Sequence, residues 1–139
     1  MTCGKVFSHL CPDGCPTEPH EENAGMYYRV VTSYPDPSTD DFKSEAEKGN
    51  VPEYGSVGRK CGLCAVSLMK ELGDAKRLMK RHQMLSLNQY VAEVYLTGGH
   101  GVVKHTHSPT YPSHHNWWVP VDVHPLLQFK IHVLGNQFG

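Results

Sequence analysis

The 139-residue chain contains no long apolar run and no marked excess of charge of either sign. No stretch approaches the roughly 18 consecutive apolar residues that a membrane-spanning helix requires, so no membrane partner is expected. Lys and Arg number 13 against 14 Asp and Glu, which gives a net charge of −1 with neutral histidines. Because no basic excess is present, we do not expect nonspecific binding to nucleic acid either.

Several motifs of common enzyme classes are also missing. The chain has no G-x-G-x-x-G after a predicted strand, no P-loop, no G-x-S-x-G and no H-E-x-x-H. Kinase, serine hydrolase and zinc protease functions therefore have no support from motifs. The first ten residues lack the apolar core of a secretory signal, so a cytoplasmic location is predicted.

Histidine and cysteine, in contrast, are abundant, with 10 His and 5 Cys. An odd number of cysteines argues against a complete disulfide framework, and closely spaced cysteines in a reducing compartment are commonly metal ligands, redox pairs or core residues. Residues 1–25 have neither helical nor strand periodicity, so we predict an irregular tail there and a single domain over residues 26–139. The tail holds Cys3, His9, Cys11, Cys15 and His20.

Apolar periodicity predicts an α+β domain with two helices. Alternating or β-branched stretches predict strands over residues 26–32, 60–66, 89–96, 102–106 and 129–134, and a strand or a turn over 114–119. Apolar spacing and capping signals predict helices over residues 39–48 and 68–82. Ser38, with Asp41 three residues later, is predicted to cap the first helix. The adjacent late strands, with 102–106 as a hairpin partner of 89–96, favour a small, twisted, mainly antiparallel or split sheet.

Two cysteine pairs have the spacing of metal ligands. Cys61 and Cys64 form a C-x2-C pair, and Cys11 and Cys15 form a C-x3-C pair. Four thiolates from two such pairs can form a tetrahedral structural zinc site. Zinc would also order the tail, because the energy of metal binding then contributes to folding.

The sequence leaves alternatives to this zinc site open. Cys3, His9 or His20 could replace one ligand. A strand over residues 60–66 would direct its two cysteines to opposite faces, so a zinc site requires a turn there, which Gly62 permits. The same cysteines could instead be buried free thiols. A thioredoxin-like redox pair fits poorly, because such a pair should begin a helix after a strand.

The histidines form a second candidate metal site. His105 and His107 lie on one face of a predicted strand, and His114 follows after a short loop. Three neutral imidazoles suit Zn, Fe, Cu or Ni, whereas the other interpretation is a set of solvated or hydrogen-bonded loop histidines. His115 precedes the Trp117-Trp118 pair, an aromatic surface suited to stacking on a planar ring.

From Tyr28 onward, several short motifs follow one another in an order that can be compared with known families. They are Tyr28-Arg29-Val30-Val31, Asp41-Phe42 with Ser44, Gly62-Leu63-Cys64-Ala65-Val66, Ala92-Glu93 and His114-His115-Asn116-Trp117-Trp118. This order resembles a family of small uncharacterised bacterial proteins. Its layout in turn resembles the ADP-ribosyltransferase-like fold, which binds NAD. The resemblance covers the domain and none of the cysteine-containing tail.

The resemblance implies a set of site residues and NAD as a ligand. The implied catalytic residues are Arg29, Glu93 and His115. The residues implied to contact the cofactor are Arg29, Tyr28, Cys64 and Trp118, with Cys64 in place of a hydroxyl residue. A guanidinium can bind a pyrophosphate through two hydrogen bonds, and a carboxylate can stabilise the oxocarbenium-like centre as nicotinamide leaves.

Two functional hypotheses follow. In the first, the protein is an NAD-using ADP-ribosyltransferase-like enzyme, or a degenerate relative, with a structural zinc. In the second, it is a zinc-binding or protein-interaction module without catalysis. The sequence does not decide between them, and it names neither the substrate nor the partner.

Overall fold

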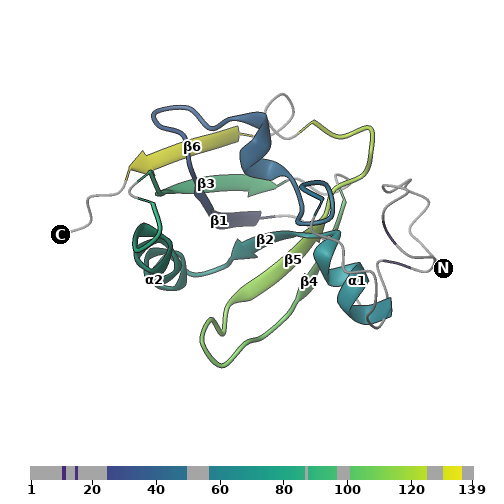
Figure 1. Cartoon of the computed structure of the whole chain (residues 1–139). Coiled ribbons are helices and arrows are strands. Elements are labelled where there is room, and N and C mark those ends of the chain that lie inside the picture. The colour runs from purple at the N-terminus through teal and green to yellow at the C-terminus, as the bar shows by residue number, and fades with distance from the viewer. Residues whose placement is uncertain are drawn as a thin grey trace.

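Antiparallel pairing joins six strands into one sheet, in the order β4-β5-β2-β1-β3-β6 (Figure 1). The computed structural model describes residues 11, 15, 25–49, 57–86, 88–96, 101–124 and 130–135. The strands are β1 (Gly25–Val31), β2 (Val66–Met69), β3 (Tyr90–Leu96), β4 (Val102–His105), β5 (His114–Trp118) and β6 (Lys130–Gly135). Together with the helices in this part of the chain, the sheet confirms the predicted α+β class.

The helical elements differ from their predicted boundaries. They are η1 (Thr39–Phe42), a single 3-10 turn, α1 (Val57–Leu63) and α2 (Leu72–Gln83). The predicted helix over 39–48 is wrong beyond Phe42, because the chain is already extended at Lys43. Within the described residues, no helix combines the length and the apolar character needed to cross a membrane.

The predicted strand over residues 60–66 is also largely wrong, because α1 occupies its first part and β2 begins only at Val66. The predicted helix over 68–82 consequently begins later, at Leu72. A short apolar run does not by itself distinguish a strand from a buried helical turn. Here Cys61, Cys64 and Ala65 pack together with Trp118, and this contact is made by a helix end rather than by a strand.

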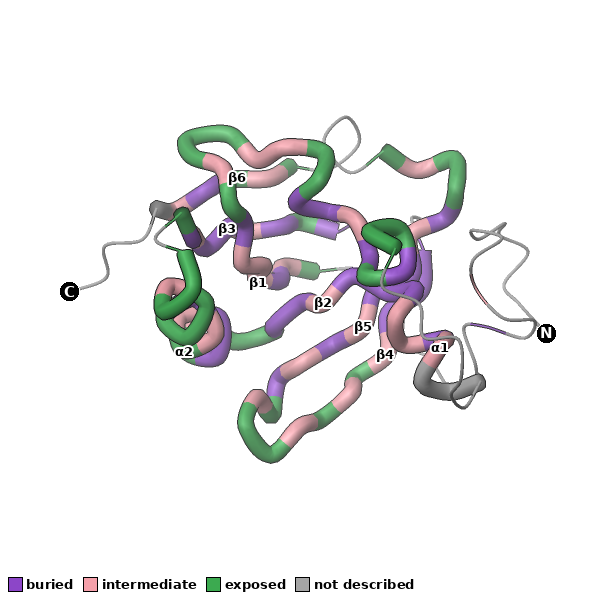
Figure 2. Tube along the Cα trace, viewed as in Figure 1, coloured by how far each residue is buried: buried purple, intermediate pink, exposed green. Residues whose placement is uncertain are grey.

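Two layers of side chains cover the sheet. On one face, Ala75 and Met79 of α2 pack against Met69 and Val91. The other core surrounds Trp117, which is fully buried. Figure 2 shows the buried side of α2 turned toward the sheet. The predicted hairpin of residues 102–106 with 89–96 is wrong, because β4 pairs with β5.

The sheet consists of two halves with a narrow junction between β1 and β2. Among the described residues, Tyr28 and Met69 are the one register pair between these strands. In contrast, β1 and β3 pair along their whole length. Next to the junction, Arg29 Nη1 donates a hydrogen bond to the Ser67 carbonyl at 2.8 Å. A side chain therefore bridges the two strands where the backbone ladder does not.

Candidate functional site

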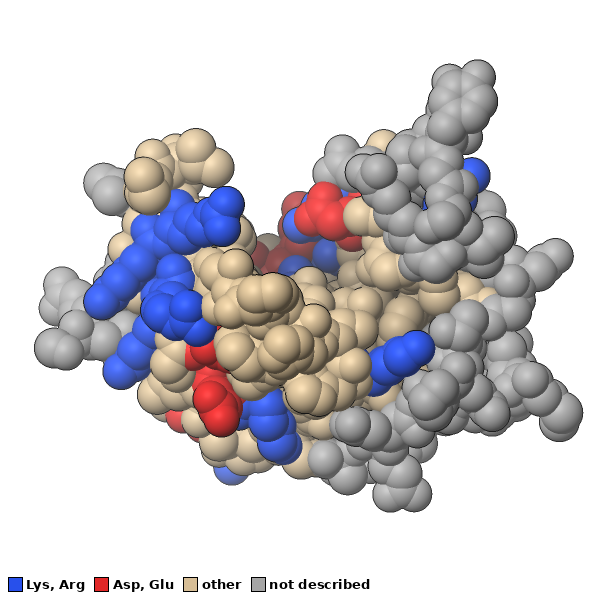
Figure 3. All heavy atoms as spheres, turned by 90° about the horizontal axis from the view of Figure 1, so that it is seen from below, with Lys and Arg blue, Asp and Glu red and all other residues tan. Residues whose placement is uncertain are grey.

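A cavity of about 710 Å³ lies over the junction of β1 and β2. One wall is formed by the C-terminal half of α2, including Leu78 and His82, and the opposite wall by the segment from Asp40 to Lys48. Figure 3 shows the hollow, with a group of Lys and Arg side chains on one side and acidic and basic side chains together on the other. The lining combines apolar, aromatic and charged groups, which is typical of a small-molecule site.

Arg29 brings a cation to this cavity. Its Nε donates to the Asp41 carbonyl at 2.6 Å, and its Nη1 donates to Ser67, while the guanidinium lies 5.8 Å from the centre of the Phe42 ring. Burial lowers the pKa of Arg29 to about 10, while the carboxylates of Asp41 and Glu45 act in the opposite direction. The guanidinium is therefore protonated at neutral pH, and its orientation is fixed by backbone carbonyls.

Ser67 and His114 form a hydrogen-bonded pair in the same cavity. The distance from Ser67 Oγ to His114 Nε2 is 3.1 Å. His114 Nδ1 lies 2.6 Å from Thr106 Oγ1 and 3.3 Å from the Thr106 carbonyl oxygen, which can only accept. In the tautomer with the proton on Nδ1, the ring donates to this carbonyl and Nε2 accepts the hydrogen bond from the Ser67 hydroxyl.

The pKa of His114 supports a neutral ring. Burial lowers this pKa most, the hydrogen bond to the Thr106 backbone raises it, and the neighbouring His115 and His105 lower it further. A neutral imidazole that accepts a proton from a hydroxyl has the arrangement of a general base with its partner. The pair can therefore either polarise the Ser67 hydroxyl or orient a ligand hydroxyl.

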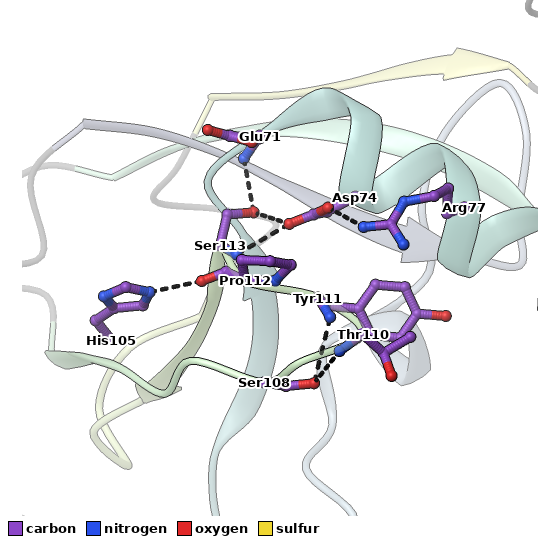
Figure 4. Close-up of polar contacts among 9 residues, drawn as sticks. All are labelled: Glu71, Asp74, Arg77, His105, Ser108, Thr110, Tyr111, Pro112 and Ser113. Carbon is purple, nitrogen blue, oxygen red and sulfur yellow. Dashed lines mark hydrogen bonds and ion pairs between the residues drawn. The ribbon is translucent and has the colours of Figure 1, made fainter.

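The start of β5, which carries His114, is held against α2. Asp74 accepts hydrogen bonds from the Ser113 backbone N–H at 2.9 Å and from the Ser113 hydroxyl at 2.6 Å, and it also pairs with Arg77 (Figure 4). Ser113 Oγ in turn accepts from the Glu71 N–H at 3.1 Å. Because Ser113 directly precedes His114, this network positions the imidazole relative to the cavity.

Asp41 organises the opposite wall. Its carboxylate accepts hydrogen bonds from the Thr32 N–H and hydroxyl, both at 2.7 Å, and from the Ser38 N–H at 2.9 Å. The Ser38 contact is the one predicted from the capping spacing. Burial alone would raise the pKa of Asp41, but the hydrogen bonds from Ser38 and Thr32 outweigh it and leave the pKa below its ordinary value of 3.8.

This lowered pKa predicts an acid-sensitive contribution of Asp41 to stability. A carboxyl whose pKa is lower in the folded chain stabilises the fold above the unfolded value of 3.8, and this contribution is lost as the pH falls below it. We expect Asp41→Asn to cost on the order of 2 kcal/mol near pH 7 and less in acid. Urea unfolding of both proteins across the acid range measures the difference. The same difference at every pH would contradict the prediction, and the exposed Asp36→Asn is the control.

Two of the residues implied by the resemblance line this cavity, and four do not. Tyr28 and Arg29 contribute to the lining. Glu93 lies on β3 and accepts a hydrogen bond from the Tyr95 hydroxyl at 2.7 Å. The buried His115 has its Nδ1 2.7 Å from the Ser113 carbonyl, and its ring stacks on His105 with centroids 4.6 Å apart.

Cys64 and Trp118 lie in a separate cluster near α1. Trp118 Nε1 donates to the Cys61 carbonyl at 2.9 Å, so this indole is a buried structural group.

Cys15 and Cys61 form a disulfide, while Cys11 and Cys64 are free thiols. All four cysteines predicted as zinc ligands therefore lie in one place. The alternative ligands Cys3, His9 and His20 lie outside the described residues, as does most of the predicted 1–25 tail.

The three histidines of the second candidate metal site do not converge. The rings of His105 and His107 are 6.3 Å apart between centroids, and His105 Nε2 lies 2.7 Å from the Pro112 carbonyl. The His114 ring uses its two nitrogens on Ser67 and Thr106. In the part of the chain that the structure describes, no group of three or more His, Cys, Asp or Glu side chains is arranged to hold a metal ion.

The sequence interpretation did not select Ser67 or assign His114 to a ligand cavity. The alternation of side chains along β5 could have indicated this placement of His114. Trp117 and His115 lie on the core face of β5, so His114 lies on the opposite face. No comparable signal existed for Ser67, because the predicted boundary of β2 was wrong.

No protein-family model, curated protein or solved structure matches this chain.

Proposed function

We propose that the cavity over the β1–β2 junction binds NAD, and that the protein is an ADP-ribosyltransferase-like enzyme or a degenerate relative of one. The observation that carries this proposal is the placement of Arg29, Ser67 and His114 at one cavity of about 710 Å³. That volume falls in the range of roughly 300–1,000 Å³ typical of small-molecule sites. The motif resemblance supplies the identity of the ligand.

Arg29 and Lys48 supply positive charge for a dinucleotide phosphate, beside the carboxylates of Asp40, Asp41 and Glu45 in the same lining. The pKa of His82 is lowered first by burial and then by three positive charges, those of Arg81, Arg29 and Lys48. Since Nε and Nη1 of Arg29 are bonded to backbone carbonyls, its Nη2 group and net charge remain to meet a phosphate oxygen. The Tyr28 and Tyr111 rings offer apolar faces for a nicotinamide or adenine.

The remaining lining groups suit transfer of the ADP-ribosyl group. In such a transfer the bond from the ribose carbon to nicotinamide breaks, with its electron pair going to the ring nitrogen, and the carbon bonds to an acceptor. Neutral His114, paired with Ser67, is placed to take the acceptor proton. Asp40 and Glu45 add negative charge to the same cavity, where a developing positive centre would be stabilised. Glu93 does not line the cavity and has no role in this proposal.

We expect NAD to raise the melting temperature of the protein in a concentration-dependent manner. Replacing His114 or Ser67 with alanine removes one polar contact worth about 1 kcal/mol, so NAD affinity should fall about five- to tenfold. Titration calorimetry measures this loss. His132→Ala, on an exposed position of β6, is the matched control and should leave affinity unchanged.

The same titration distinguishes the alternative function. A zinc-binding or interaction module without catalysis predicts no thermal shift with millimolar NAD and no difference between the His114 and His132 variants. That result would remove the proposed function, whether or not the protein contains zinc.

A further inference from the structure

The four described cysteines form a mixed cluster of one disulfide and two free thiols near the end of β2. Cys15 and Cys61 are bonded, with a Cα–Cα distance of 5.5 Å. The thiols of Cys11 and Cys64 are hydrogen-bonded to each other. Three of the four residues are buried, and Cys11 is partly buried. We refer to these four residues as the cysteine cluster.

Local backbone geometry presents the C-x2-C pair to a common centre. Cys61 lies in the last turn of α1, and Cys64 lies in the turn that follows, with the Cys64 N–H bonded to the Cys61 carbonyl at 3.1 Å. Residues three apart in a helical turn project from the same side. Cys61 and Cys64 therefore do not point to opposite faces, as they would in a strand. The turn that a metal site requires is present between them.

We propose that the reduced cysteine cluster binds one zinc ion through all four thiolates, and that the Cys15–Cys61 disulfide and the zinc complex are alternative states of the same site. A thiol reductant first converts the disulfide to two thiols and is itself oxidised to a disulfide. The four thiols then bind Zn²⁺ and release four protons, which leaves a complex of net charge −2. In the disulfide state two ligands are consumed, in agreement with the absence of a metal-ready group among the described residues.

The donors and their surroundings fit zinc. Thiolates are soft ligands that select zinc over magnesium or calcium, and two short-spaced pairs are the usual framework of a structural site. Cys11 and Cys64 already supply two thiols at this place, and reduction of the Cys15–Cys61 disulfide adds the other two.

A second cavity gives access to the cluster. It measures about 210 Å³ and is lined by Cys11 and Cys64, with Glu47 and His124 on its wall. A metal ion or a small thiol can therefore reach the two free sulfurs without unfolding the sheet. This site is separate from the NAD cavity, so the zinc proposal stands or fails independently of the proposed function.

The test compares zinc content in the two redox states. The full chain is purified without chelators, treated with a dithiol reductant and excess zinc, and desalted under anaerobic conditions. We expect about one zinc per chain by elemental analysis, with the cysteine cluster protected from alkylation. Hydrogen peroxide should then release the zinc as the Cys15–Cys61 disulfide forms, which peptide mapping would detect.

Variants and a spectroscopic probe make the result specific. Cys11→Ser, at the partly buried position, should lower zinc retention at least tenfold in competition with a chelator, whereas Cys3→Ser should not change it. Cobalt added to the reduced wild-type protein should produce the intense visible bands of tetrahedral thiolate coordination, a readout that requires no variant. A reduced protein that holds no zinc and reacts at all five cysteines would overturn the proposal.

Discussion

Arg29→Met is expected to lower the free energy of unfolding by about 3 kcal/mol. Arg29 donates to the carbonyls of Asp41 and Ser67 across the narrow junction of the sheet. A methionine has similar length but no donor, so both carbonyls lose a partner, and each unsatisfied group costs roughly 1–3 kcal/mol. Access to the cavity lets water replace part of this loss, which keeps the estimate near the lower end. Urea denaturation measures the change.

Two further variants separate the role of this side chain from a general effect of lost charge. Arg81→Met removes the same group from an exposed position of α2 and should change stability by less than about 0.5 kcal/mol. Arg29→Lys keeps the charge but lacks the planar guanidinium group, so it should recover only part of the stability and, if the cavity binds NAD as proposed, part of the affinity. An Arg29→Met protein as stable as wild type would show that the junction does not depend on this side chain.

Asp74→Ala is expected to cost about 3 kcal/mol and also to weaken the proposed binding of NAD. The carboxylate is buried and joins Ser113 and Arg77, so alanine removes three charge-assisted contacts at once. Ser113 would keep its contact with the Glu71 N–H but lose its anchor on α2. Since His114 follows directly, its imidazole should lose its fixed position in the cavity.

Chemical denaturation and NAD titration of the Asp74→Ala protein check the two parts of this prediction. The exposed Asp122→Ala is the matched control and should leave both quantities unchanged. Burial alone would raise the pKa of Asp74, but the Ser113 hydrogen bonds and Arg77 leave it below 3.8, so the stability difference should shrink in acid. A loss of stability with unaltered NAD affinity would separate the network from the ligand site.

The strands that the sequence predicted well are those with a clear period. Five of the predicted strands correspond to β1, β3, β4, β5 and β6, with boundaries within one residue. The strand predicted over residues 60–66 is the one placed wrongly. Residues 60–66 contain apolar groups that suit either a helix end or a strand, and contact with Trp118 decides between them. Pairing of β4 with β5 also depends on contacts that no local pattern encodes.

The residues of the candidate site also differ in whether the sequence indicated them. Arg29 and Tyr28 were accessible from the sequence because the resemblance places them on the first strand. Ser67 was not, because its role depends on where β2 begins. His114 and His115 have the same side-chain chemistry, and only the facing of β5 places the first in the cavity and the second against Tyr27 in the core.

The sequence alone determined that the chain is an α+β domain and that its Cys-x-x-Cys and Cys-x-x-x-Cys pairs are candidates for one site, because periodicity and spacing are local properties. The tertiary structure decided which groups meet. It brings Cys11 and Cys15 to Cys61 and Cys64, across a separation of 46 residues between the disulfide partners. It also brings three strands together at one cavity, because strand order and side-chain facing are set by packing of the whole sheet.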